Sequence, residues 1–220
     1  LIMLHQSPLS SRNYEAVLPL LAGHCRPAAL DTPGYGGSSA VPEDWTVADY
    51  AQVVWDVADR LAAERVFVFG RATGAVFALE AALAQPQRVQ GLVLHGMPVY
   101  TDAERADRMQ NFAPPFPAAA DGSHLTCIWK RIHNEYPWIG PELATHFAHD
   151  FLSAGPDFDR LGVDAAMAAR ALTASTIAGA DSKSMSAIQH GMTSRPWYLC
   201  HLVLSVPARS GQLSKLKAMG

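Results

Sequence analysis

The chain has 220 residues, of which 49% are hydrophobic and 17% charged, enough to bury one substantial core without disulfides or metal. A formal net charge of −3 gives no electrostatic attraction for nucleic acid or an anionic membrane, which bind clustered Lys and Arg. Three cysteines without C-x-x-C spacing predict neither a disulfide framework nor a zinc site. No leader or membrane-spanning run is evident. We therefore expect a cytoplasmic protein that acts on a small molecule without cofactor or metal.

The first hundred residues alternate between strand-like and helix-like segments, an order typical of a parallel sheet with helices on both faces. The chain opens on a buried strand already in progress, so we expect it to be incomplete at its start as well as at its end. Segment 46–63 is the clearest helix, because Thr46 and Asp49 are placed as a capping box before an apolar face. The expected strands are 1–4, 27–30, 66–69 and 90–95, and the other expected helices are 11–21 and 75–84.

The alternation stops after residue 95 and gives way to a long stretch rich in Ala, Pro and aromatic residues. Prolines divide this stretch into short helices, because proline lacks an N–H donor and clashes within a helix. Strand character returns at 197–206. We therefore expect an α/β core over residues 1–100, an inserted helical cap over 101–195, and a returning core strand with an atypical tail over 196–220.

The sequence Gly70-Arg71-Ala72-Thr73-Gly74 joins a strand directly to a helix. In a strand-turn-helix of the form G-x-nucleophile-x-G, the middle residue is strained so that its side chain faces the substrate. The next residue, Thr73, points its backbone N–H to where an oxyanion forms, and its hydroxyl is expected to point away. Ala72 occupies the nucleophile position, and a methyl group cannot attack a carbonyl.

Three segments resemble the α/β-hydrolase superfamily: Leu4-His5-Gln6-Ser7-Pro8, Asp31-Thr32-Pro33-Gly34-Tyr35-Gly36-Gly37-Ser38, and the turn around Ala72. The resemblance implies an α/β fold with a mostly parallel sheet, helices on both faces and a helical cap. It implies that Ser7 donates the second oxyanion N–H beside that of Thr73. Gln6 stands where the family has glycine and is a candidate substrate contact. The implied parent activity is hydrolysis of a small organic ester, lactone or related carbonyl compound.

The inserted region, with Asp121-Gly122-Ser123-His124-Leu125 and Trp129, resembles the cap of a small-molecule branch in which some elbows also lack serine. The family pattern implies an acid after a late strand and a histidine after the last one. From Lys183 to Gly220 there is no Asp or Glu, so neither partner is assigned. We therefore expect no covalent catalysis of the serine type.

Four further residues are candidate substrate contacts, each with a structural alternative. His5 either shapes the pocket or hydrogen-bonds a loop. Arg71 either meets a carboxylate or enolate group or caps the loop at the surface. Trp129 and Trp138, like the neighbouring Tyr136, either line an apolar pocket or pack in a core.

The order strand, Gly70, Gly74, helix also resembles the phosphate turn of a dinucleotide-binding unit. That unit needs a third glycine and an acid at the end of the next strand, where His95 and Gly96 stand. Three functions stay open: an altered hydrolase, a non-catalytic relative that binds a small apolar or carbonyl-containing molecule, and a serine-independent proton-transfer or elimination enzyme. The oligomeric state is not predicted.

Overall fold

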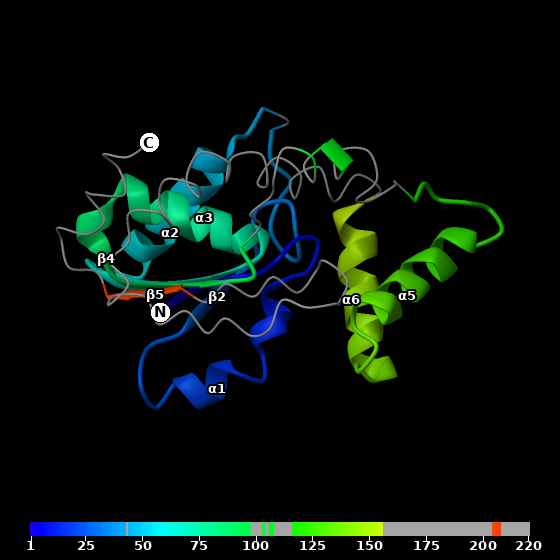
Figure 1. The fold of residues 1–220 in the computed structure, drawn as a ribbon, viewed down its shortest axis with the longest axis horizontal. Helices are drawn as coiled ribbons and strands as arrows, with labels where there is room; N and C mark the ends of the chain where they lie inside the picture. The colour runs from blue at the N-terminus through cyan, green and yellow to red at the C-terminus, as the bar shows by residue number, and fades with distance from the viewer. Residues whose placement is uncertain (43, 98–102, 104–105, 108–115, 156–203, 208–220) are drawn as a thin grey trace.

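The computed structural model describes residues 1–42, 44–97, 103, 106–107, 116–155 and the backbone of 204–207. A sheet with its covering helices forms one group of elements, and a helical hairpin lies beside it (Figure 1). The strands are β1 (Ile2–Leu4), β2 (Ala28–Leu30), β3 (Val66–Arg71), β4 (Val89–His95) and β5 (Leu204–Pro207), and the helices are α1 (Leu18–Leu21), α2 (Val47–Arg60), α3 (Thr73–Ala84), α5 (Ser123–Glu135) and α6 (Pro141–Ala154).

The sheet has the order β2-β1-β3-β4-β5, with the first four strands parallel. This confirms the predicted mostly parallel sheet with covering helices. The returning strand β5 pairs antiparallel with β4, and residues 197–203 of the expected strand lie outside the described residues. The chain runs from β1 to the neighbouring β2 on one side and then crosses to β3 on the other side of β1. The topological switch point, where open α/β sheets bind ligands, therefore lies between β1 and β3.

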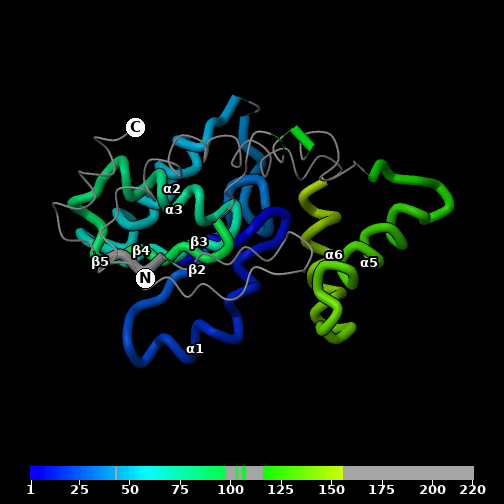
Figure 2. Tube along the Cα trace, viewed as in Figure 1, coloured from blue at the N-terminus to red at the C-terminus, as the bar shows by residue number. Residues whose placement is uncertain are grey.

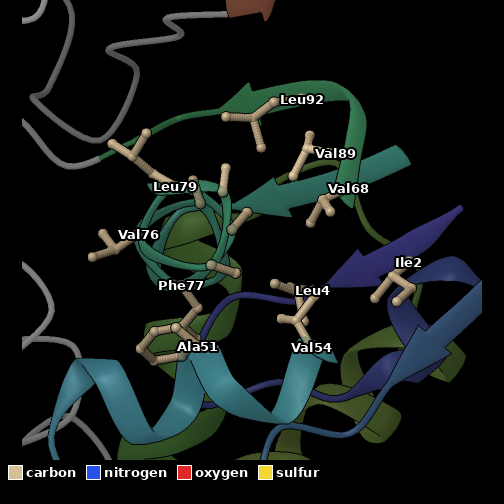
Figure 3. Packing of buried hydrophobic residues seen from close by; sticks show 14 of the residues in the cluster. Ile2, Leu4, Ala51, Val54, Val68, Val76, Phe77, Leu79, Val89 and Leu92 are labelled. Carbon is tan, nitrogen blue, oxygen red and sulfur yellow. The ribbon is translucent and has the colours of Figure 1, made fainter. Parts of the chain in front are cut away.

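Helices α2 and α3 cover one face of the sheet and α1 lies on the other, as Figures 1 and 2 both show. Alternation along β3 buries Val66 and Val68 on the α3 side and leaves Phe67 on the opposite face, 50% exposed. Phe77 projects from α3 toward α2, where it lies beside Ala51 (Figure 3). The main core is therefore the layer between the sheet and these two helices.

The predicted capping box is confirmed, since the Thr46 N–H donates to the Asp49 carboxylate at 2.7 Å. The single helix predicted over 11–21 is wrong. The chain instead forms a 3₁₀ helix at Ser11–Tyr14 and one α-helical turn at Leu18–Leu21. Pro19 explains the break, because it has no N–H to donate to the Glu15 carbonyl and its ring clashes with that carbonyl in a continuous helix.

The α5–α6 hairpin packs on the loop that follows β1. A second apolar cluster consists of Leu9 from that loop with Ile128, Ile132, Ala144, Phe147 and Phe151 from the hairpin. Beside it the buried Ser10 hydroxyl donates to the buried Asp150 carboxylate at 2.7 Å. Apolar burial and a charge-assisted hydrogen bond together hold the hairpin against this loop.

Among the helices of the described residues, none combines the length and the apolar character that crossing a bilayer requires.

Candidate active site

The loops at the carboxyl edge of the sheet meet beside the switch point. Leu4 at the end of β1 lies opposite Gly70 of β3, and Arg71 lies opposite His95 of β4. The residues that directly follow β1 and β3 therefore share one edge of the sheet. This brings the predicted oxyanion turn next to Ala72.

Ala72 adopts the strained conformation that the turn pattern predicts, with φ 48° and ψ −115°. Its N–H donates to the His95 carbonyl at 2.9 Å, and its carbonyl accepts from the Ala75 N–H at 2.9 Å. A non-glycine residue in such a region costs on the order of 1–3 kcal/mol and persists only where its surroundings enforce it. The elbow is thus intact as backbone geometry, and Ala72 is partly exposed at its tip.

The two glycines of the turn are required by close backbone approach. A Cβ on Gly70 would lie 2.2 Å from the Gly74 carbonyl oxygen. A Cβ on Gly74 would lie 2.5 Å from the Leu4 carbonyl oxygen and 2.6 Å from that of His5. The glycines therefore let α3 begin in direct contact with the end of β1, which fixes the elbow against the loop after β1.

The predicted oxyanion donors Ser7 and Thr73 are joined through their side chains, because the two hydroxyl oxygens lie 2.8 Å apart and are hydrogen-bonded. The buried Thr73 hydroxyl thus faces the turn after β1. Within the described part of the chain, no acceptor is recorded for the backbone N–H of either residue. Two N–H groups at adjoining turns with no internal acceptor are available to an oxygen atom of a ligand.

His5 is 1% exposed, and backbone groups use both of its ring nitrogens. Nδ1 lies 2.9 Å from the Gln6 carbonyl, and Nε2 accepts from the Thr32 N–H at 2.9 Å. This pattern requires the neutral tautomer with the proton on Nδ1. Burial lowers the pKa of His5 and outweighs the Gln6 hydrogen bond and the Asp31 charge, which raise it. Of its two predicted roles, the structure supports the loop-binding one.

The depressed pKa of His5 predicts that the protein loses stability as the pH falls through about 6.5, the ordinary value. Only the unfolded state takes up the proton there, so stability falls by up to about 1.4 kcal/mol per pH unit. Urea unfolding between about pH 7 and pH 5 measures this slope. A His5→Gln variant should flatten it and the exposed-site control His24→Gln should not. An unchanged slope in His5→Gln would contradict the assignment.

Asp31 holds the turn that follows β2. Its carboxylate accepts from the Ser11 N–H at 2.7 Å and from the Gly37 N–H at 2.8 Å. Partial burial raises the pKa of Asp31, but the hydrogen bonds from Gly37 and Ser11 outweigh it and keep the pKa below its usual value. Asp31 is therefore an ionised structural anchor, which explains its place in the segment 31–38 that resembles the family.

Gln6 and Tyr136 connect the oxyanion turn to the hairpin. The Gln6 Nε2 donates to the Tyr136 hydroxyl across 130 residues of sequence. Burial raises the pKa of Tyr136, and the nearby charge of Arg71 opposes that shift. Arg71, half-buried at the end of β3, is thus electrostatically coupled to this hydroxyl. The sequence carries no signal for the Gln6–Tyr136 contact, because nothing local in either segment specifies its partner.

Trp129 and Trp138 are both open to solvent on the hairpin, and the Trp138 ring meets that of Tyr136 edge to face. Trp129 is 38% exposed on α5 and packs against His133, and Trp138 is 71% exposed. Tyr136 instead packs edge to face on Phe147 with ring centroids 5.2 Å apart. Of these aromatic residues, Tyr136 is the one that contacts the loop after β1.

No group of three or more His, Cys, Asp or Glu side chains within the described ranges is arranged to hold a metal ion.

Comparison with known proteins places this geometry in a family. The profile of the alpha/beta hydrolase fold matches residues 1–137. The pimeloyl-[acyl-carrier protein] methyl ester esterase of Edwardsiella ictaluri is 33% identical over 93 residues, 42% of this chain and 34% of that protein. The 2-hydroxy-6-oxononadienedioate/2-hydroxy-6-oxononatrienedioate hydrolase of Cupriavidus pinatubonensis is 39% identical over 87 residues, 39% of this chain and 29% of that protein.

A solved structure of similar fold is a serine-to-alanine variant of the meta-cleavage product hydrolase from Pseudomonas fluorescens, with a TM-score of 0.54 and 22% identity. The superposition covers 74% of this chain and 59% of that one. The matches to the two curated relatives span about a third of each relative's length. The profile match covers more than half of the chain and includes the oxyanion turn and the elbow. The chain therefore belongs to the α/β-hydrolase-fold family.

Proposed function

We propose that this chain is a relative of small-carbonyl hydrolases that binds its ligand at the elbow but forms no covalent intermediate. The parent activity is hydrolysis of a small organic ester, lactone or related carbonyl compound. Ser7 and Thr73 present their N–H groups to the ligand's carbonyl oxygen, and Ala72 has no side-chain group that could attack the carbonyl carbon. On this proposal the α5–α6 hairpin is part of a cap over the site, and the protein works in the cytoplasm.

One observation carries the proposal: the elbow keeps its strained backbone although its tip bears only a methyl group. Ala72 holds φ 48°, a conformation that helix formation alone does not need. The proposed direction of the Thr73 N–H, toward the loop after β1, is supported by the hydrogen bond between the Ser7 and Thr73 hydroxyl groups. Charge stabilisation by oriented N–H donors is separable from nucleophilic attack, and only the first is supported here.

The similar proteins favour a carbonyl compound as the ligand class. One is named as a methyl ester esterase and another as a hydrolase of an oxo acid. The matches cover only 93 and 87 residues, so the substrate of neither protein is assigned to this chain. Both names include a carbonyl group, an ester in one and an oxo group in the other, which suits the proposed pair of oxyanion donors.

The covalent step is tested with an activated ester. We expect 4-nitrophenyl acetate to give no burst of 4-nitrophenolate and no acetylated protein in intact-mass spectra, because Ala72 cannot attack. Loss of the nucleophile leaves at most about 10³ to 10⁴ over the rate in water, by analogy with triad proteases. Ser7→Ala is the matched control for acylation at the neighbouring hydroxyl. A stoichiometric burst that survives Ser7→Ala would contradict the proposal.

Calorimetric titration with a ketone or ester separates binding from other chemistry in the same site. A saturable heat of binding, with the ligand recovered chemically unchanged, supports a protein that binds the ligand without converting it. Product formed without a burst would instead favour the serine-independent enzyme, since oriented donors can assist proton transfer or elimination without a covalent intermediate.

A further inference from the structure

Arg71 is a partly buried cation beside the elbow. It directly precedes Ala72, and its backbone lies opposite His95 at the ligand-binding edge of the sheet. A guanidinium has five N–H donors and no acceptor, and a partly buried one is normally matched by an acceptor. Over the ranges that the structure describes, no carboxylate or carbonyl is recorded as accepting from the Arg71 side chain. Its hydrogen-bonding capacity is therefore open to a ligand.

The Tyr136 hydroxyl is a second donor, held against Gln6 in the loop after β1. Its oxygen accepts from the Gln6 Nε2, so its own proton needs another acceptor, and none is recorded for it in the described segments. Tyr14, also coupled electrostatically to Arg71, donates its hydroxyl proton to the Leu4 carbonyl at 2.9 Å. Tyr14 is thus already hydrogen-bonded, whereas the side chains of Arg71 and Tyr136 keep donors without a recorded acceptor in the described part of the chain.

The carboxylates of Asp31 and Asp150 accept hydrogen bonds from other donors. Asp31 accepts from the backbone of Ser11 and Gly37, and Asp150 accepts from the Ser10 hydroxyl. An acceptor-only group brought by a ligand would complete the arrangement, and a planar carboxylate matches the fork of a guanidinium.

We propose that the site selects small oxo acids, with the ligand's carboxylate held by Arg71 and the Tyr136 hydroxyl and its carbonyl oxygen at the N–H groups of Ser7 and Thr73. This rests on the proposed function and narrows it to anionic ligands. Recognition at two points orients the ligand's carbonyl at the elbow, because the carboxylate is bound by Arg71, the residue that directly precedes Ala72.

The test uses one matched ligand pair, 4-oxo-4-phenylbutanoate and its methyl ester, titrated into the full chain by calorimetry. Both probes carry the ketone, and only the acid carries the anion. We expect the acid to bind about tenfold or more tighter than the ester, the size of one charge-assisted hydrogen-bonded contact. Arg71→Gln should abolish that preference. The control Arg65→Gln removes an equal charge from an exposed site just before β3, at the opposite edge of the sheet, and should keep the preference.

A second variant guards against misfolding of Arg71→Gln. Tyr136→Phe keeps the ring that packs on Phe147 and should weaken acid binding several-fold while leaving ester binding nearly unchanged, since it removes one donor to the carboxylate. Equal affinity of the native chain for acid and ester would overturn this inference and leave the proposed function standing. Failure of both probes to bind would overturn the proposed function and this inference with it.

Discussion

Gly74→Ala is expected to lower the free energy of unfolding by about 3 kcal/mol, measured by urea denaturation. The added Cβ would lie 2.5 Å from the Leu4 carbonyl oxygen and 2.6 Å from that of His5. Both are backbone atoms in the centre of the fold, so neither can rotate away as a side chain would. Relief of the clash requires α3 to move off β1, which breaks contacts on both sides of the elbow.

Gly23→Ala is the matched control for this substitution. No atom lies within 4 Å of the Cβ that it would add, and it carries the same change in backbone entropy. We expect its unfolding midpoint to equal or slightly exceed that of the native chain. If Gly74→Ala and Gly23→Ala unfolded at the same urea concentration, the close approach of α3 to β1 would be refuted.

Phe77→Ala should cost about 3–5 kcal/mol of unfolding free energy, the range for large-to-small changes at fully buried aromatic positions. The Phe77 ring is 1% exposed and stacks on Tyr50 with centroids 5.0 Å apart. Truncation would open a cavity between α2 and α3, the layer drawn in Figure 3. The same denaturation experiment gives the value.

Phe67→Ala provides the comparison for the Phe77 prediction, because Phe67 lies on the other face of β3 and is 50% exposed. Its expected cost is about 1 kcal/mol or less. A larger effect at Phe67 than at Phe77 would place the principal core on the wrong face of the sheet.

Much of the fold could be predicted where a local rule acts alone. Helix α2 follows from its capping box and apolar face, and β3 with the elbow follows from a β-branched and aromatic run that ends at Gly70. The 11–21 prediction failed because helical spacing of apolar residues takes no account of Pro19, which cannot donate to the Glu15 carbonyl in a continuous helix.

The contacts that tie the hairpin to the site could not be predicted, because their partners lie far apart in sequence. Ser10 and Asp150 are 140 residues apart, and Gln6 and Tyr136 are 130 apart. One sequence signal for Asp150 existed: it falls between Phe147 and Phe151 on the buried face of α6. An acid on an apolar helix face predicts a buried partner without saying which residue supplies it.

The proposed function requires that the backbone of the elbow keep its conformation without an attacking side chain at position 72. The strain at Ala72 is enforced by Gly70, Gly74 and the hydrogen bond to the His95 carbonyl. All of these are backbone features that a change of side chain at position 72 does not touch. On the proposed function, the N–H donors of Ser7 and Thr73 therefore keep their orientation without a nucleophile and support ligand binding.

The most direct test of this account is a titration followed by the backbone amide signals of ¹⁵N-labelled protein, with 4-oxo-4-phenylbutanoate as the ligand. Saturable shifts of the Ser7 and Thr73 amide signals are expected, because on the proposed function these N–H groups receive the carbonyl oxygen. Saturation that shifts other signals and leaves these two unchanged, or no shift at any ligand concentration, would contradict it.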